Sequence, residues 1–223
     1  MVWSMSESDE GKHEIEIRIH SRGGQGGVTA AKMLAVAASL EGKYSTAFSI
    51  YGAERRGSPT ASFTRISNRE IRKYSQIRKP DCVIVMDPTI ASVVDVTEGL
   101  KPGGKLLINV GNNSMDLERF RDYEVYAVDA TRVSLRFDLK VAGIPVLNVP
   151  MVGAAAKLGI ISLDSAKQAI LKVLGGGSVV ISLARYAGTT ALDGTESLPS
   201  TMRKNLMAAE LAYKETKRLN GSG

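Results

Sequence analysis

The 223-residue sequence contains little cysteine, histidine or aromatic residue and no long hydrophobic run. Its single cysteine, Cys82, excludes an intrachain disulfide, and one thiolate falls short of the four that an iron–sulfur cluster normally takes. The two histidines, His13 and His20, do not supply the ligand set of a zinc site, so no metal ligand is predicted. No apolar run reaches the ~20 residues of a membrane-spanning helix. These absences predict a cytoplasmic protein with no membrane segment and no redox centre of its own.

The two ends of the chain differ in composition from its middle. Residues 1–13 are polar and lack the apolar stretch of a secretion signal, which predicts a disordered leader. Residues 14–219 are long enough for one large domain. Within this domain the signal over residues 178–200 is weak, and residues 201–219 predict a C-terminal helix.

Strand and helix patterns alternate along the predicted domain. Ile15, Ile17 and Ile19 alternate with polar residues, which predicts a strand with one buried face. The alanine-rich stretch 28–40 predicts a helix, and a second strand follows over residues 44–50. This alternation favours an α/β fold, a three-layer αβα domain of the Rossmann-like type.

The rest of the chain continues this alternation and adds a hairpin. Residues 61–66 and 71–74 predict a β-hairpin, which makes the mostly parallel sheet mixed. The apolar run 81–87 predicts a central strand covered on both faces, and a helix is expected over residues 88–100. Further strands are predicted over residues 105–110 and 123–128, and further helices over 129–141, 148–159 and 162–174.

A glycine-rich loop joins the first strand to the first helix. Its glycines allow positive φ angles and the close approach of another group, and free N–H groups at a helix start favour an anion. Thr29 stands where a dinucleotide motif needs its third glycine, and no lysine completes a P-loop. A tight turn that binds nothing fits the same glycines. The candidate cofactor-binding residues are Arg22, Gly23, Gly24, Gln25, Gly26, Gly27 and Thr29.

The net charge of +6 is concentrated in residues 51–80. Eight basic residues face two acidic ones there, so this segment carries the whole excess of six. Such a local positive field suggests a phosphorylated cofactor, an acidic protein or a nucleic acid as partner, while an ordinary solvated surface is the alternative. Phe63 and Tyr74 are the segment's aromatic residues besides Tyr51, which is few for stacking bases.

Several short motifs occur in a fixed order along the chain. They are Arg22-Gly23-Gly24-Gln25-Gly26, Val28-Thr29-Ala30, Tyr51-Gly52-Ala53-Glu54-Arg55-Arg56-Gly57, Pro80-Asp81, Leu100-Lys101-Pro102-Gly103-Gly104, and Asn148 with Met151 and Gly153-Ala154. Taken together, they resemble the gamma subunit, or the equivalent fused domain, of 2-oxoacid:ferredoxin oxidoreductases. Arg22 and the pair Arg55-Arg56 look more like the branch that acts on pyruvate and branched-chain oxoacids.

The resemblance implies a subunit of an enzyme complex rather than an enzyme by itself. Such a complex oxidatively decarboxylates a 2-oxoacid, here pyruvate, with coenzyme A to acyl-CoA, carbon dioxide and reduced ferredoxin. Thiamine diphosphate and iron–sulfur clusters are implied in partner alpha, beta and delta subunits or their fused equivalents. The chain binds no cofactor alone, and a contact to coenzyme A is left open. No catalytic residue is predicted, because no Ser-His-Asp or paired-acid arrangement is evident.

A charged loop after the second strand completes the list of candidates. We interpret it as an ion-pairing loop at a subunit interface, with one arginine free for a phosphate or carboxylate; a weak surface salt bridge is the alternative. A stand-alone nucleotide- or nucleic-acid-binding protein that uses residues 51–80 is the alternative function. The candidate interface or phosphate-contacting residues are Tyr51, Glu54, Arg55 and Arg56.

Overall fold

A computed structural model gives the fold for most of the chain. The described residues are 14–50, 57–73, 75–111, 118–175 and 198–219. The predicted leader, the candidate interface loop and nearly all of the weak segment 178–200 therefore lie outside the described residues. None of the helices in the described ranges is both long and apolar enough to cross a membrane.

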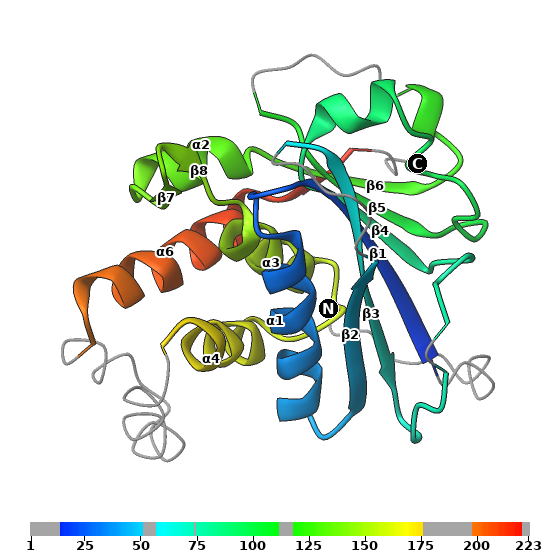
Figure 1. Ribbon diagram of the computed structural model, residues 1–223, viewed down its shortest axis with the longest axis horizontal. Coiled ribbons are helices and arrows are strands. Elements are labelled where there is room, and N and C mark those ends of the chain that lie inside the picture. The colour runs from blue at the N-terminus through cyan, green and yellow to red at the C-terminus, as the bar shows by residue number, and fades with distance from the viewer. Residues whose placement is uncertain (1–13, 51–56, 74, 112–117, 176–197, 220–223) are drawn as a thin grey trace.

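A seven-stranded mixed sheet forms the centre of the structure, in the order β2-β3-β1-β4-β5-β6-β9 (Figure 1). Strands β1, β4, β5 and β6 pair in parallel, whereas β3 is antiparallel to β1 and β2, and β9 to β6. Five strands thus point one way and two the other, which confirms the predicted mixed, mostly parallel sheet. The strands are β1 (Glu14–Arg22), β2 (Tyr44–Ile50), β3 (Pro59–Ser67), β4 (Cys82–Val85), β5 (Lys105–Asn109), β6 (Glu124–Val128) and β9 (Lys217–Arg218).

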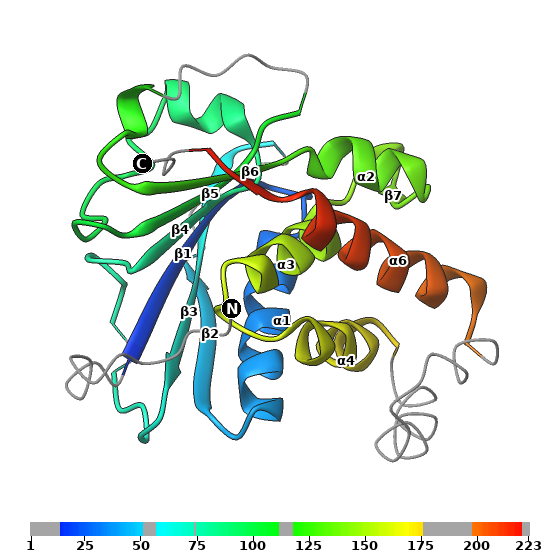
Figure 2. The same ribbon diagram turned by 180° about the vertical axis from the view of Figure 1, so that it is seen from behind.

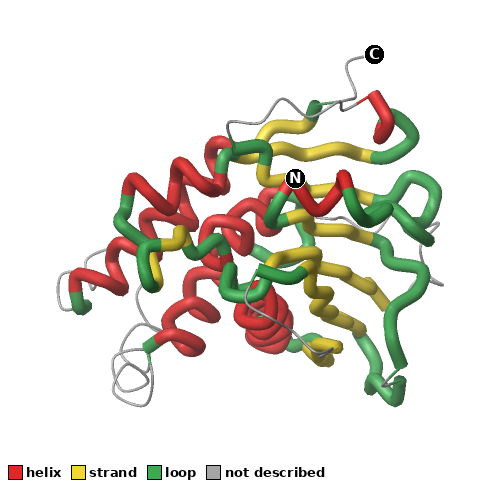
Figure 3. The backbone as a smooth tube through the Cα atoms, turned by 45° about the horizontal axis from the view of Figure 1, so that its top comes forward, coloured by secondary structure: helices red, strands yellow, loops and turns green. Residues whose placement is uncertain are grey.

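The α-helices gather on one face of this sheet, as Figures 2 and 3 show. The opposite face is covered by two 3₁₀ helices, η2 (Pro88–Ser92) and η3 (Glu118–Phe120), and by the segments around them. A two-stranded hairpin of β7 (Lys140–Val141) and β8 (Ile144–Pro145) stands apart from the main sheet. The helices are α1 (Gly27–Leu40), α2 (Ala130–Arg136), α3 (Asn148–Lys157), α4 (Leu163–Leu174) and α6 (Ser200–Glu215).

Two hydrophobic cores lie on the two faces of the sheet. In β4 the side chains of Cys82 and Ile84 join the core under the α-helices, while Val83 and Val85 join the core under η2 and η3. Successive strand residues point to opposite faces, so a strand buried on both sides must be apolar at every position. This two-sided burial explains the continuous apolar run of residues 81–87. Burial also raises the pKa of the Cys82 thiol to about 12.

Strand β1 is buried on both faces, so the prediction of a single buried face was wrong. Arg18 and His20 point into the second layer and are each only 8% exposed. The Arg18 guanidinium donates hydrogen bonds to the carbonyl oxygens of Val96 (3.1 Å) and Glu98 (2.6 Å). The segment after β4 folds over the polar side of β1 and supplies backbone acceptors, a tertiary contact that alternation along one strand does not reveal.

The predicted hairpin between residues 61–66 and 71–74 is also wrong. Strand β3 pairs instead with β2 over seven residues, from Tyr44 opposite Ser67 to Ile50 opposite Ala61. The guanidinium of Arg65 donates to the carbonyl oxygens of Lys73 (3.1 Å) and Ser75 (2.6 Å). These carbonyls are turned toward a side chain, which is incompatible with a regular strand ladder there.

Three predicted helices are shorter than expected. The helix over residues 88–100 is only the turn η2, because the Asp95 carboxylate accepts from the Thr97 backbone N–H and hydroxyl and so competes with helix hydrogen bonding. The helix from residue 129 ends at Arg136, and the β7–β8 hairpin follows. The last helix, α6, ends at Glu215, after which the chain enters β9 and extends the sheet beside β6.

Helix α3, which begins at Asn148 as predicted, packs closely against α6. A Cβ atom built on Gly153 would lie 2.2 Å from the carbonyl oxygen of Ala209, so only glycine allows the two helix backbones this close approach. Helix α3 is buried from Asn148 to Ala156. The helix layer is therefore fixed by small residues as much as by large apolar ones.

Burial of His20 predicts a pH-dependent stability. Burial and the neighbouring Arg18 charge lower the pKa of His20 to about 4, from an ordinary value of 6.5. Protonation therefore favours the unfolded chain as pH falls from 6.5 toward 4, and at pH 5 this costs roughly 2 kcal/mol. Denaturant unfolding at pH 7 and pH 5 should show this loss in the wild type and not in His20→Gln. An equal pH dependence in both proteins would contradict the assignment.

Candidate functional site

The glycine loop after β1 is shaped by close contacts with its neighbours. A Cβ on Gly27 would lie 2.1 Å from the Ser21 hydroxyl oxygen, and one on Gly26, whose φ is +92°, would lie 3.0 Å from the Asn148 side chain. Gly26 is the N-cap of α1, and no side chain caps this helix, so Thr29 does not serve as its cap. The glycines thus serve a tight strand-to-helix turn, and Gly24 is the exposed residue at its tip.

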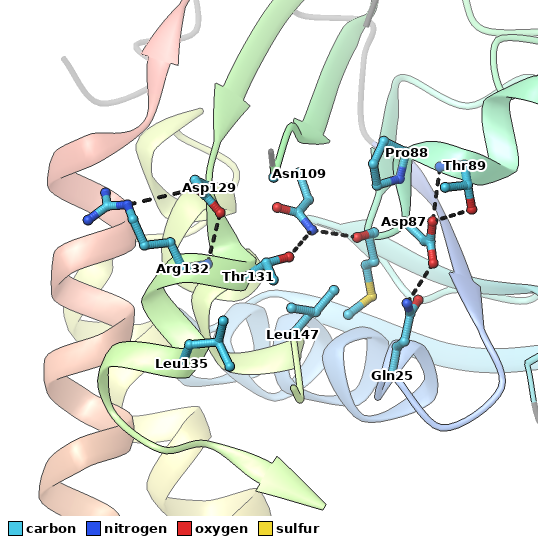
Figure 4. A pocket seen from close by; sticks show the side chains of 12 residues that line it. Gln25, Asp87, Pro88, Thr89, Asn109, Asp129, Thr131, Arg132, Leu135 and Leu147 are labelled. Atoms are coloured by element: carbon cyan, nitrogen blue, oxygen red, sulfur yellow. Dashed lines mark hydrogen bonds and ion pairs between the residues drawn. The ribbon is translucent and has the colours of Figure 1, made fainter. Parts of the chain in front are cut away.

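Gln25 ties this loop to the end of strand β4. Its Oε1 accepts from the backbone N–H of Arg22 at 2.8 Å, and its Nε2 donates to the Asp87 carboxylate at 2.8 Å (Figure 4). Its backbone carbonyl accepts from the N–H of Leu147, just before α3. One side chain and its backbone therefore join β1, β4 and α3, three elements far apart in the sequence.

Arg22 is held by the same group of residues rather than being free. Its Nε lies 3.2 Å from the Asp87 carboxylate, and its guanidinium donates to the Thr89 hydroxyl at 2.7 Å and to the Gly57 carbonyl at 3.0 Å. Burial opposes ionisation of Asp87, but hydrogen bonds from Thr89 and Gln25 and the charge of Arg22 outweigh it, so the pKa of this carboxyl lies below its usual value. Asp87 is accordingly a carboxylate at neutral pH.

A cavity of about 580 Å³ opens beside this cluster, at the carboxyl ends of β4, β5 and β6. Strands β1 and β4 are neighbours, but the connection after β1 leads toward one edge of the sheet and the connection after β4 leads toward the other. Gln25 and Asp87 meet at this topological switch point. Open α/β sheets bind ligands at this position. The cavity lining includes Gln25, Asp87, Asn109, Asp129, Thr131 and Leu147.

Asn109 forms the polar floor of the cavity. Its Nδ2 donates to the Met86 carbonyl at 2.9 Å and to the Thr131 hydroxyl at 3.0 Å, and its Oδ1 accepts from the Ala130 backbone N–H at 3.0 Å (Figure 4). Beside it, the Asp129 carboxylate caps α2 by accepting from the Arg132 N–H at 2.8 Å. The floor is thus a rigid network that links β4, β5 and α2.

The cavity has the size and lining of an organic ligand site. Its volume lies within the range of small-molecule and cofactor sites, ~300–1,000 Å³, and polar or charged residues make up seven of its twelve lining residues. No group of three or more potential metal ligands occurs among the residues that the structure describes. The geometry therefore suits an organic molecule or an inserted side chain that makes hydrogen bonds.

The structure brings some of the predicted site residues together. Gln25 lines the cavity and Arg22 contacts the lining residues Asp87 and Thr89, whereas Tyr51 and the charged residues 54–56 lie outside the described residues. The basic segment is not one exposed patch, because Arg65 is 1% exposed and pairs with Glu16 at 2.9 Å.

Three residues of the site were missed by the sequence analysis as functional candidates. Asp87, Asn109 and Asp129 each follow or end a predicted apolar strand. Polar residues at the ends of predicted strands could therefore have indicated the site. Combining them would have required the order of the strands in the sheet, which the sequence does not give.

Comparisons with known proteins agree on one family. A model described as pyruvate ferredoxin/flavodoxin oxidoreductase matches residues 16–193. The chain is 42% identical to pyruvate synthase subunit PorC of Methanocaldococcus jannaschii over 202 residues, 90% of this chain and 96% of that one. It is 45% identical to the pyruvate/ketoisovalerate oxidoreductases common subunit gamma of Thermococcus litoralis over 166 residues, 73% of this chain and 88% of that one.

A solved structure shows the same likeness. The crystal structure of pyruvate oxidoreductase subunit PORC from Thermotoga maritima matches with a TM-score of 0.68 at 32% identity, over 92% of this chain and 98% of that one. The match extends over nearly all of both chains, so the whole fold is shared.

Replacing Gln25 by glutamate should loosen the site in a pH-dependent way. The new carboxylate would face that of Asp87, and two carboxylates in one site cannot both ionise without cost. We expect Gln25→Glu to lose about 1–3 kcal/mol of unfolding free energy at pH 7, with a smaller loss near pH 4, where one carboxyl is protonated. Gln25→Ala, the control, removes the same hydrogen bonds without that pH dependence. Equal pH profiles for the two variants in urea unfolding would contradict this account.

Proposed function

This chain belongs to the pyruvate ferredoxin/flavodoxin oxidoreductase family as a subunit of the gamma type, and we propose that its complex oxidatively decarboxylates pyruvate with coenzyme A. The products are acetyl-CoA, carbon dioxide and reduced ferredoxin. The observation that carries the proposal is the similarity to pyruvate synthase subunits over nearly the whole chain. The stand-alone nucleic-acid-binding alternative has no such support, and burial of Arg65 removes part of the basic segment on which it depended.

We place the redox chemistry in partner subunits. Alpha, beta and delta chains, or fused equivalents, would hold thiamine diphosphate and the iron–sulfur clusters, and ferredoxin would take electrons from the assembled complex in the cytoplasm. The single cysteine of this chain supports that division, because a cluster normally takes four cysteine thiolates. Cys82 is moreover fully buried in β4, away from any route to a ligand.

The glycine loop and Arg22 would face the coenzyme A side of the shared site. Gly24 has φ +97°, and no atom of the described residues lies within 4 Å of the position of a Cβ, which leaves room at the loop tip for a neighbouring molecule. The guanidinium of Arg22 is oriented by Asp87 and Thr89 and its side chain keeps 29% exposure. An oriented arginine at a partly exposed rim suits a phosphate or carboxylate. Arg22 and the glycine loop would position coenzyme A, and this chain would make or break no covalent bond.

The charged residues 51–56 would contribute to the interface with the partner subunits. Tyr51, Glu54, Arg55 and Arg56 offer one aromatic anchor, one acid and two guanidinium groups. Tyrosine and arginine are enriched in the centres of protein–protein interfaces. This part of the proposal rests on the sequence.

Purification from a native anaerobic extract tests the proposed function. The chain should co-purify at equal stoichiometry with subunits that contain iron and thiamine diphosphate. With a single cysteine, this chain cannot hold an iron–sulfur cluster, so the partner subunits must hold it. The purified complex should reduce ferredoxin only when both pyruvate and coenzyme A are present, and more slowly with 2-oxoisovalerate. A chain that purifies alone, or a complex that is inactive with every 2-oxoacid tried, would refute the proposal.

The interface assignment predicts a loss of assembly on charge reversal. Arg55→Glu combined with Arg56→Glu should weaken association with the partner subunits at least tenfold, since unlike charges at an interface become like charges. The matched control is Arg69→Glu combined with Arg78→Glu, two exposed residues of the same basic segment. Subunit titration by light scattering measures both. Equal weakening in the two double variants would point to net charge rather than to this loop.

A further inference from the structure

Strand β2 forms one edge of the described sheet, and its own sequence carries none of the residues that usually protect an edge from further pairing. It is paired with β3 along its whole length, and no described strand lies on its other side. Its sequence, Tyr-Ser-Thr-Ala-Phe-Ser-Ile, contains no charge and no proline. Exposed edge strands usually carry such residues, because their free N–H and C=O groups otherwise pair with another chain. Tyr44 and Ile50, at the two ends of β2, are 53% and 45% exposed.

A groove runs beside this edge, between β2 and helix α1. Its volume is about 650 Å³, and Val28, Val36 and Ala47 contribute apolar walls. Figures 1 and 2 show α1 lying alongside β2. The small residues on the helix-facing side of β2, Ser45 with its hydroxyl bonded to the Ala35 carbonyl among them, leave this space open.

One charged side chain, Lys32, is found among the described residues that line the groove. Lys32 is exposed, and no ion pair joins it to another residue in the described part of the chain. An ammonium group at the margin of an apolar groove favours an incoming carboxylate, which gains from a charge that water does not fully screen. The groove therefore selects by charge as well as by shape.

We propose that an extended segment of a partner subunit adds to β2 as a further strand. Its backbone would pair with the free edge, and its alternate side chains, small or apolar, would enter the groove beside α1, with one carboxylate opposite Lys32. Strand addition obtains affinity from main-chain hydrogen bonds and specificity from pockets for alternate side chains. The inference rests on the proposed membership of a multi-subunit complex, and it names a surface and a type of partner segment for that assembly.

A second copy of this chain suits the surface less well than an acidic partner. Antiparallel pairing of two β2 strands would bring two identical α1 grooves together, each with its Lys32, and would unite two chains that each carry a net charge of +6. Like charges that face each other across an interface oppose association. A partner segment that carries a carboxylate removes this repulsion.

Hydrogen exchange on the chain alone and in the reconstituted complex tests the strand addition directly. The amides of β2 that point away from β3 should exchange freely in the isolated chain and become at least tenfold slower in the complex, because each gains an acceptor. Amides of β9, the other edge of the sheet, provide the internal comparison. Unchanged exchange along β2 in an assembled complex would overturn the proposal.

Substitutions at the edge supply an independent measurement. Ala47→Lys places a charge on the exposed edge and should weaken subunit association at least tenfold, and Lys32→Glu should weaken it about fivefold by repelling the carboxylate. Val141→Lys, a matched change at an exposed strand residue of β7, should leave association unchanged. Thermal unfolding of each isolated variant should match the wild type, since all three sites are exposed.

The outcomes separate this inference from the proposed function. If the wild type forms the active complex and Ala47→Lys does so with the same affinity, only the strand addition is wrong. If the isolated wild type is a dimer that Ala47→Lys converts to a monomer, a second copy occupies β2 and the proposal is overturned. If the wild type associates with no thiamine-containing subunit at all, the proposed function itself fails.

Discussion

The carboxylate of Asp87 is the point on which the site depends. It accepts hydrogen bonds from Gln25 and Thr89 and pairs with Arg22, so it joins the loop after β1 to the turn after β4. Hydrogen bonds to an ionised group are stronger than those between neutral groups, and partial burial keeps water from replacing them. This tie fixes the glycine loop relative to the turn after β4, while the backbone hydrogen bond from Leu147 to the Gln25 carbonyl fixes it relative to α3.

The sheet makes that tie possible through the parallel pairing of β1 with β4, and both faces of the sheet are covered. Strands β1 and β4 run in parallel in the middle of the sheet, so their carboxyl ends meet at one edge. The α-helical layer packs closely through Gly153 and its neighbours, and the segment after β4 covers Arg18 on the other face, where His20 is also buried. The polar face of β1 is therefore buried, and this burial strongly lowers the pKa of His20.

On the function that we propose, this subunit would contribute surfaces and positioning rather than reactive groups. The cavity rim and the edge of β2 lie on different parts of the sheet, one at the strand ends and one along a lateral strand. The cavity has the volume of a small-molecule site, and we propose that the edge of β2 pairs with a polypeptide segment. In the proposed assembly, the edge of β2 would hold the chain in place and leave the loop around Gln25 free for a ligand.

Local residue patterns in the sequence determined the elements whose signals are local. The first strand, the helix from Gly27, the second strand at Tyr44–Ile50 and the apolar strand at Cys82–Val85 follow from periodicity and from glycine, and the ordered motifs were sufficient for the family. Tertiary structure alone decided the pairing of β3 with β2, the end of α6 in a strand, and the meeting of Gln25 with Asp87. In these cases the deciding contact is one that a local pattern does not record: Arg65 donates to the Lys73 carbonyl, Asp87 accepts from Gln25, and β9 pairs with β6.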